Sequence, residues 1–327
     1  MVKVAAFNCR KDELEFFHKY SEELGIELLV IDESPSLKNL DLVRGCQAVS
    51  VITTPISGEL IEGWTELGIL GISTRTVGFE HVDCARAAEL GIPVSNVGYS
   101  PDTVAEYAVM SILMALRRMK TILLRAEAQD YSLIDVRGKE LCRLTVGVIG
   151  TGRIGETVIR NLSGFGCRIL AYDLHEKESV KAMAEYASLE RIWAECDVIT
   201  LHAPSTAETH HLINKESIGR MKDGVVIVNT ARGTLIDTPA LIEALESGKI
   251  GAAALDVVEH ETGIYYKDFK YQPVAHHEMA ILKAMPNVLM TPHTAFFTDE
   301  AVGNMVEYSL KSCVLAANGE RDPWQVN

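Results

Sequence analysis

Short runs of β-branched and other apolar residues alternate with amphipathic, helix-like stretches along almost the whole chain of 327 residues. The first series of strand-like runs is Lys3–Phe7, Leu28–Ile31, Ala48–Ile52, Leu70–Ser73 and Pro93–Ser95. A second series follows, with Thr145–Ile149, Arg168–Tyr172, Val198–Leu201, Val225–Asn229, Ala252–Val257 and Val288–Thr291. This rhythm predicts parallel sheets covered by helices on both faces. The fold class is therefore α/β, with two doubly wound parallel-sheet domains.

The boundary between the two series is predicted to be a rigid helix that crosses between the domains. Thr103 and Glu106 have the spacing of a capping box and follow Pro101. They begin a helical pattern whose apolar face continues to Met119. Near the end of the chain, a helical pattern over 299–317 is expected to return and cover the first domain. Further helical patterns within the first series are Asp12–Leu24, Gly58–Leu67 and His81–Leu90.

A glycine-rich turn, Gly150-Thr-Gly152-Arg-Ile-Gly155, directly follows the first strand of the second series and opens a helical pattern. In a GxGxxG turn the three glycines allow a tight turn, close approach of a pyrophosphate, and packing of the helix on the strand. The helix N-terminus then binds the phosphates. The next strand ends in Asp173, roughly 20 residues on, where a carboxylate hydrogen-bonds ribose hydroxyls and repels a 2′-phosphate. The pattern predicts NAD binding; a purely structural turn is the alternative.

Polar side chains follow three later strands of the second series. Arg232, the acids Asp256, Glu259 and Glu261, and His293 stand in these positions, and the carboxyl ends of strands in open α/β sheets form ligand sites. An arginine fork matches a carboxylate, and a histidine beside a glutamate is suited to donate a proton. Together they indicate reduction of a 2-oxo acid by NADH. The alternative is a strand cap, a solvated acid and a buried histidine.

Composition excludes several classes of protein. A net charge of −14 disfavours nucleic acid and anionic membrane surfaces as partners. No run reaches the ~18 apolar residues of a membrane helix, and the N-terminus lacks a signal-peptide layout. The seven cysteines are scattered without CxxC spacing, which is typical of reduced thiols. A cytoplasmic enzyme is expected.

Several of these segments together resemble the NAD-dependent D-2-hydroxyacid dehydrogenase family, most closely its D-lactate dehydrogenase branch. The resemblance covers essentially the whole chain. It is carried by Ser73–Gly78, Asn96–Asp102, Thr145–Asp173, Val225–Asp237, Ala252–Glu261 and Met285–Thr298.

The resemblance implies a role for each matching residue. Arg232, Glu261 and His293 are expected to be catalytic, with His293 the proton donor. Substrate is expected to contact Val77, Gly78, Tyr99, Arg232 and Phe296. The residues expected to bind NAD are Gly150, Gly152, Arg153, Ile154, Gly155, Asp173, Ala203, Pro204, Thr209, Thr230, Ala231, Arg232, Asp256 and His293.

The resemblance also implies a domain arrangement. Residues 1–101 and 299–327 would form a flavodoxin-like substrate domain. Residues 102–298 would form an inserted Rossmann domain for NAD, with the cleft between the two domains. A homodimer joined partly through 119–141 is expected.

The leading hypothesis for the activity is conversion of pyruvate and NADH to D-lactate and NAD⁺. Ile52 stands where lactate enzymes often carry an aromatic residue, so bulkier 2-oxo acids such as 2-oxoisocaproate and phenylpyruvate are the alternative. A formate, glycerate or phosphoglycerate dehydrogenase and an NADH-sensing binding protein are further alternatives. His260 replaces the usual glycine between two glutamates, and its role is open.

Other clusters have plainer interpretations. His276-His277-Glu278 lacks a third spaced ligand, so no metal site is predicted. His202, His210 and His211 are interpreted as surface or cofactor-rim residues, and Tyr265-Tyr266 as aromatic core. The acidic residues Glu13, Glu15, Glu22 and Glu23 are interpreted as a solvated helix face.

Overall fold

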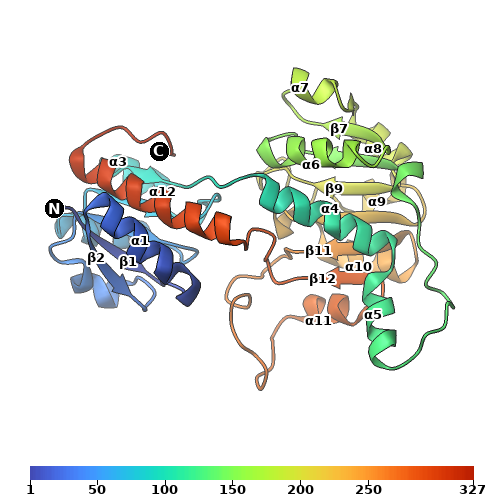
Figure 1. The fold of residues 1–327 in the computed structure, drawn as a ribbon, viewed down its shortest axis with the longest axis horizontal. Helices are drawn as coiled ribbons and strands as arrows, with labels where there is room; N and C mark the ends of the chain where they lie inside the picture. Colours follow the sequence, from blue (N-terminus) through green and yellow to red (C-terminus); the bar gives the residue numbers. More distant parts are fainter. The chain divides into compact units, whose positions relative to one another are not determined.

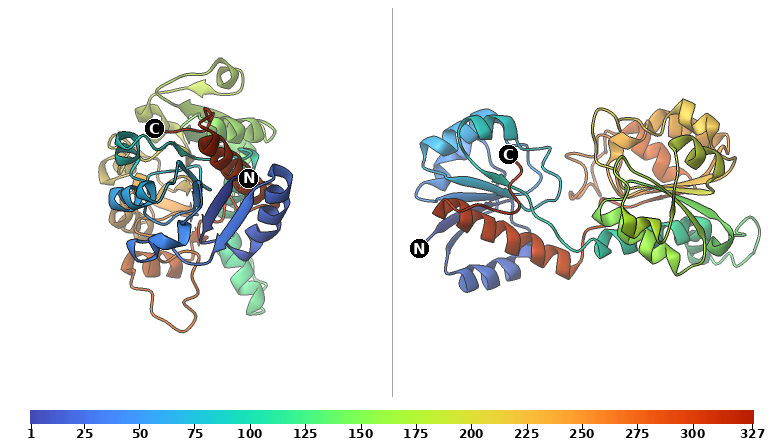
Figure 2. Two further views of the ribbon diagram at one scale, coloured as in Figure 1. Left: turned by 90° about the vertical axis from the view of Figure 1, so that its left-hand side faces the viewer. Right: turned by 90° about the horizontal axis from the view of Figure 1, so that it is seen from above.

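The computed structural model describes residues 1–327, which divide into two compact units. Unit 1 comprises Met1–Ser100 and Phe297–Asn327, and unit 2 comprises Pro101–Phe296. Each unit contains one parallel sheet with helices on both faces (Figures 1 and 2). The predicted fold class is confirmed. None of the helices combines the length and apolar character that crossing a membrane requires.

Unit 1 contains a five-stranded sheet in the order β2-β1-β3-β4-β5, the flavodoxin-like order. Its strands are β1 (Lys3–Phe7), β2 (Glu27–Ile31), β3 (Ala48–Val51), β4 (Gly71–Thr74) and β5 (Val94–Ser95). Its helices are η1 (Lys11–Glu13), α1 (Leu14–Leu24), η2 (Leu37–Val43), α2 (Gly58–Glu66), α3 (Cys84–Glu89) and α12 (Asp299–Asn318). Helices α1 and α12 pack side by side on one face, so the chain end returns to the first domain as predicted (Figure 1).

Unit 2 contains a seven-stranded sheet in the order β12-β11-β10-β9-β6-β7-β8. The order reverses between β6 and β9, as in the Rossmann fold. The strands are β6 (Thr145–Ile149), β7 (Arg168–Tyr172), β8 (Glu185–Tyr186), β9 (Val198–Leu201), β10 (Val225–Asn229), β11 (Ile250–Leu255) and β12 (Val288–Met290). The helices are α4 (Asp102–Leu116), α5 (Met119–Glu127), η3 (Leu141–Arg143), α6 (Arg153–Ser163), α7 (Glu178–Lys181), α8 (Leu189–Glu195), α9 (Lys215–Arg220), η4 (Gly233–Leu235), α10 (Thr238–Glu246) and α11 (His277–Ala284).

Alternating side chains of the unit 2 strands fill two separate cores. Val146 and Val148 of β6 lie in the core beneath α4 and α6, whereas Ile149 lies in the core beneath α8 and α10. All three are buried because a parallel strand has both faces covered. The two cores hold the carboxyl ends of the strands, and the loops that follow them, in fixed positions.

The structure corrects the predicted boundary helix. Helix α4 begins at Asp102 with Pro101 at its N-cap and no side-chain cap, so the capping box at Thr103 and Glu106 is wrong. The helix lies wholly in unit 2, where it packs on α6 and β10, and therefore does not cross between domains. It also stops before Met119, because Arg118 adopts a left-handed conformation with φ of 52° and α5 begins anew.

Two smaller expectations in unit 1 also change. Helix α3 begins only at Cys84, because the Asp83 carboxylate caps it by accepting from the Arg86 amide. Glu15, Glu22 and Glu23 are exposed as expected, but Glu13 is fully buried. The interpretation of Glu13 as part of a solvated face is wrong, since its carboxylate pairs with Arg75 at 2.9 Å.

Candidate active site

The glycine-rich turn joins β6 to α6 at the point where the strand order reverses. Gly150 has φ of +92°, and a Cβ there would lie 2.6 Å from the His202 backbone carbonyl that follows β9. A Cβ at Gly155 would lie 1.8 Å from the Gly150 carbonyl oxygen. Both positions therefore require glycine for packing. Arg153 and Ile154 form the first turn of α6, with Gly152 at its N-cap.

Gly152 differs from these two glycines, because nothing in the protein lies within 4 Å of a Cβ added there. The open space at this N-cap fits the phosphates of a dinucleotide, whose charge a helix N-terminus attracts. Thr230, which follows β10, has a buried hydroxyl without a hydrogen-bond partner in the protein. An open glycine and an unsatisfied buried hydroxyl fit a bound dinucleotide.

Asp173 lies directly after β7, and its carboxylate accepts hydrogen bonds from the amides of Thr151 (2.6 Å) and His175 (3.0 Å). Burial acts to raise the pKa of the Asp173 carboxyl, but these hydrogen bonds outweigh it and hold the pKa below its usual value. Asp173 is therefore ionised at neutral pH and fastened to the glycine-rich turn.

The remaining predicted cofactor residues lie on neighbouring loops. Ala203 and Pro204 follow β9, beside the backbone that Gly150 contacts. The Thr209 hydroxyl donates to the Pro204 carbonyl (2.6 Å) and so closes the turn after β9. Ala231 follows β10, and its amide donates to the Asn229 side chain at 3.0 Å.

Arg232 sits on the turn that follows β10. Its backbone carbonyl accepts from the Asn229 side chain (2.8 Å), and its Nη1 donates to the Ala231 carbonyl (2.8 Å). The next residue, Gly233, lies against a second turn, because a Cβ there would come within 2.1 Å of the Val258 backbone. Gly233 thereby lets the arginine turn and the acidic turn of residues 257–261 pack directly together.

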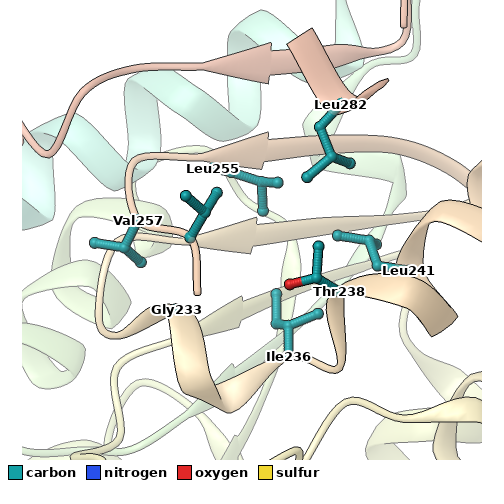
Figure 3. A pocket seen from close by; sticks show the side chains of 8 residues that line it. Gly233, Ile236, Thr238, Leu241, Leu255, Val257 and Leu282 are labelled. Carbon is teal, nitrogen blue, oxygen red and sulfur yellow. The ribbon is translucent and has the colours of Figure 1, made fainter. Parts of the chain in front are cut away.

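A small cavity of about 10 Å³ lies beneath these two turns (Figure 3). Its lining is almost entirely apolar, with Leu241, Leu255 and Leu282 among the side chains around it. This volume is at the lower limit for one water molecule. The cavity is a gap in packing rather than a substrate site.

Glu261 and His293 lie together as predicted from the family resemblance. His293 Nδ1 and Glu261 Oε1 are 2.5 Å apart, and the second oxygen of Glu261 accepts from the Val258 amide at 2.8 Å. The two side chains are 30% and 20% exposed. The other imidazole nitrogen of His293, Nε2, has no hydrogen-bond partner within the chain and is therefore available to a ligand.

Asp256 fastens the turn that carries His293. It is almost completely buried, and its carboxylate accepts from the Thr291 hydroxyl (2.6 Å) and from the amides of Thr294 and Ala295 (2.9 Å each). Its carbonyl accepts from the His293 amide at 2.8 Å. The position of Asp256 beside the cofactor stays a prediction; within the chain its carboxylate is bound to the turn that carries His293.

Aromatic rings surround His293. Phe296 lies edge-on to its ring, with centroids 6.4 Å apart, and Tyr266 lies at 6.3 Å. The Tyr266 hydroxyl donates to the His293 carbonyl at 2.9 Å. Tyr266 is half exposed, so its interpretation as core is wrong, whereas Tyr265 packs on the apolar core of unit 2.

The other predicted substrate residues lie in unit 1. The exposed Val77 and the half-buried Gly78 lie in the loop after β4, in which the Thr76 hydroxyl donates to the Gly78 carbonyl (2.6 Å). The Val77 carbonyl accepts from the Asn96 side chain (2.7 Å), near the half-buried Tyr99. Ile52 directly follows the neighbouring strand β3 and is buried.

The histidines outside the catalytic set have structural partners. Burial lowers the pKa of His202 to about 3, and its Nε2 lies 2.9 Å from the Thr200 hydroxyl. His276 is buried at the N-cap of α11, where Nδ1 accepts from the Met279 amide (3.2 Å).

His210, His211 and Glu259 have ligand atoms within 4.8 Å of one another, as a metal site would require. However, both oxygens of Glu259 already accept hydrogen bonds, from His211 (2.7 Å) and from Thr238 (2.7 Å). The group is therefore a hydrogen-bonded pair with a stacked neighbour. Sequence reasoning missed the His211–Glu259 pair, because no local pattern joins residues so far apart in the chain.

Comparison with known proteins gives a consistent result. The family model "D-isomer specific 2-hydroxyacid dehydrogenase, NAD binding domain" matches residues 109–295. A D-specific alpha-keto acid dehydrogenase of Enterococcus faecium is 40% identical over 96% of each chain. An aromatic 2-oxoacid reductase of Clostridium sporogenes is 43% identical over 94% of each chain. The solved structure of a D-lactate dehydrogenase from Treponema pallidum, at 33% identity, superposes with a TM-score of 0.90 over the whole of both chains.

Proposed function

Because the chain belongs to the D-isomer-specific 2-hydroxyacid dehydrogenase family, an NAD-linked group of oxidoreductases, we propose that it reduces pyruvate to D-lactate. In this reaction pyruvate is reduced by NADH and takes up a proton, which gives D-lactate and NAD⁺. Unit 2 would bind NAD and unit 1 would contribute Val77, Gly78 and Tyr99 to substrate binding. The absence of disulfides among the seven cysteines supports a cytoplasmic location.

The observation that carries the proposal is the 2.5 Å contact between Glu261 and His293, which leaves Nε2 of the imidazole unbonded. In the proton-donating state, both nitrogens carry hydrogen: Nδ1 donates to Glu261 and Nε2 donates to the substrate carbonyl oxygen. When bound, NADH supplies the hydride that the carbonyl carbon accepts. The proton on Nε2 passes to the oxygen, which becomes the hydroxyl of the product.

Arg232 is proposed to bind the substrate carboxylate, since a guanidinium offers two parallel N–H donors to it. The direct packing of Gly233 on Val258 keeps the arginine turn adjacent to the acidic turn. The residues that would hold NAD are those of the glycine-rich turn, with Asp173 on the ribose hydroxyls and Thr230 near the cofactor.

Steady-state kinetics with NADH test the substrate assignment. We expect kcat/KM to be higher for pyruvate than for 2-oxobutyrate, 2-oxoisocaproate and phenylpyruvate, with D-lactate as the product. If kcat/KM is higher for phenylpyruvate, the proposed substrate would be a bulky 2-oxo acid instead of pyruvate. NADH binding without turnover of any of the four would favour the binding-protein alternative.

Arg232→Lys tests the carboxylate contact. Lysine keeps the charge but loses the fork, so kcat/KM for pyruvate should fall by roughly 30- to 1000-fold. Arg220→Lys is the control, since Arg220 pairs only with Glu216 on the surface of α9. Full activity of Arg232→Lys would leave Arg232 a structural residue.

We also propose that the protein is a homodimer through the segment of residues 119–141. No residue of α5 is buried, and the loop after it is exposed. Large apolar residues gather on this segment: Leu123, Leu124, Tyr131, Leu133 and Ile134 are all exposed. Such a concentration of exposed apolar residues is typical of an interface, and a second copy of the chain is the proposed occupant.

Sedimentation analysis of Leu133→Asp tests the dimer. A charge placed in the interface should yield monomer, whereas Leu174→Asp, at another exposed leucine, should remain dimeric. A monomeric unmodified protein, or a Leu133→Asp variant that is still a dimer, would contradict the proposal.

A further inference from the structure

We propose that the second histidine–carboxylate pair, His211–Glu259, is a positioning device that fixes the turn of residues 257–261 and thereby holds Glu261 against His293. The inference rests on the proposed function for its kinetic consequence. Its structural basis is independent of that function, because it depends only on contacts within unit 2.

The Glu259 side chain is fully engaged. Its Oε1 lies 2.7 Å from His211 Nε2, and its Oε2 accepts from the hydroxyl (2.7 Å) and the amide (3.1 Å) of Thr238. The side chain is only 11% exposed. Burial acts to raise the pKa of the Glu259 carboxyl, but the hydrogen bonds from His211 and Thr238 lower it below its usual value. Glu259 is therefore an ionised internal anchor.

The backbone of the same turn is held from other elements. The Glu259 carbonyl accepts from His276 Nε2 (2.8 Å) at the N-terminus of α11. His276 Nδ1 accepts from the Met279 amide, so the ring must carry its single proton on Nε2 when neutral. Gly233 packs on the Val258 backbone from the opposite turn. The turn is thus fastened by the loop after β9, the start of α10, the start of α11 and the turn after β10.

These contacts are needed to hold the turn of residues 257–261, because its backbone conformation is unfavourable. His260, between the two glutamates, adopts a left-handed conformation with φ of 57°. A non-glycine residue in that region is conformationally unfavourable and persists only where its surroundings impose it. This conformation carries Glu259 to Thr238 and His211, and Glu261 to His293. Loosening the Glu259 end therefore releases Glu261.

The pair is suited to positioning rather than proton transfer. Its carboxylate has no free oxygen, and the His211 N–H on Nε2 donates to Glu259 whether the ring is neutral or protonated. A loss of the anchor should therefore lower kcat without moving the alkaline limb of the pH profile. That result would separate it from Glu261, which contacts the proton donor directly.

Three variants test the inference in the full-length protein. His211→Leu removes the donor, His211→Gln keeps an N–H donor to Glu259, and His210→Leu is the matched control at the adjacent histidine. We expect His211→Leu to lower kcat roughly 10- to 100-fold, as misplacement of a catalytic group does. The His211→Gln variant should recover most of this loss, the His210→Leu variant should lose none, and the binding of NADH should not change.

Hydrogen–deuterium exchange of the peptide that covers residues 256–264 gives a readout that needs no activity. Exchange there should rise in His211→Leu and stay unchanged in His210→Leu. Unchanged exchange and unchanged kcat in His211→Leu would overturn the inference, as would a shift of the alkaline limb. If the unmodified protein does not reduce pyruvate, the proposed function fails, while the exchange experiment still decides whether His211 holds the turn.

Discussion

Each unit has a carboxylate paired with a basic side chain just beyond the carboxyl end of a parallel strand, and the two pairs differ in exposure. In unit 1, Arg75 follows β4 and contacts Glu13 at 2.9 Å, with both side chains 0% exposed. In unit 2, His293 follows β12 and contacts Glu261 at 2.5 Å, with the side chains 30% and 20% exposed. One pair is sealed inside the protein, and the other is open to a ligand.

The hydrogen bonds of the two basic groups explain this difference. Arg75 donates to Glu13, to the Ser50 hydroxyl (3.0 Å) and to the Phe7 carbonyl (2.9 Å), and lies over the Phe17 ring. An arginine side chain offers only N–H donors, and those of Arg75 are engaged within the protein. His293 keeps Nε2 unbonded and can exchange a proton. A carboxylate–base pair whose donors are all hydrogen-bonded within the protein stabilises the fold. A pair with one unbonded nitrogen can exchange a proton with a ligand.

Breaking the buried pair should have the largest effect. Glu13→Leu leaves the Arg75 charge unpaired in the interior, which costs about 3–5 kcal/mol of stability. Urea unfolding of the full-length protein should show this loss in the transition of unit 1. Glu23→Leu, at an exposed position on α1, should change the free energy of unfolding little. Equal stabilities of the two variants would mean that the pair contributes nothing to the fold.

Removing the open pair's histidine should affect activity rather than stability. His293→Ala removes the proposed proton donor, so kcat/KM should fall at least ~100-fold at every pH, equivalent to about 2.7 kcal/mol. The free energy of unfolding should stay close to that of the unmodified protein. A large loss of stability in His293→Ala would mean that the His293–Glu261 pair also stabilises the fold, so that it would not differ in role from the Arg75–Glu13 pair.

The charge of Glu261 should influence how the rate of reduction depends on pH. In the proposed mechanism His293 must be protonated for reduction, and a carboxylate at hydrogen-bond distance favours an imidazolium. Glu261→Gln removes the carboxylate charge beside the imidazole, so the alkaline limb of kcat/KM for reduction should move toward acid. A profile from pH 5 to 10 measures the shift.

Glu259→Gln is the internal control for this experiment. Its carboxylate lies against Thr238 and His211 instead of His293, so the limb should not move even if kcat falls. A shift in Glu259→Gln without one in Glu261→Gln would reverse the assignment of the two acids. If neither variant shifts the limb, the pairing has no effect on proton transfer.

Sequence reasoning succeeded where local chemistry decides the structure. The strands β6, β7, β9 and β10 lie where the apolar runs predicted them, because buried parallel strands need such runs. The glycine-rich turn follows from steric limits at Gly150 and Gly155 that any such turn shares. The choice of Glu261 over Glu259 as the partner of His293 came from the family resemblance, and the spacing of residues alone did not distinguish them.

It failed where a distant side chain decides the environment. Glu13 is read as solvated from its neighbours, yet Arg75, 62 residues away, draws it into the core. Glu259 likewise depends on His211, 48 residues away. The break after α4 at Arg118 needs a left-handed residue that its own type does not favour. Periodicity carries no information on such long-range pairs.

The smallest expected effect concerns the position of the Glu261–His293 pair. Two adjacent tyrosines, Tyr265 and Tyr266, test it. The Tyr266 hydroxyl donates to the carbonyl of His293, whose backbone is left-handed with φ of 53°. Tyr266→Phe removes one hydrogen bond, so kcat should fall about fivefold, or ~1 kcal/mol.

The Tyr265 hydroxyl is buried without a partner, so Tyr265→Phe should retain full kcat and leave the free energy of unfolding equal or higher. Burial, together with the charges of Glu261 and Asp256, raises the pKa of Tyr265, so its phenol stays neutral and takes no part in the pH profile. A Tyr265→Phe variant that loses more activity than Tyr266→Phe would show that the unpartnered hydroxyl, rather than the bond to His293, serves the reaction.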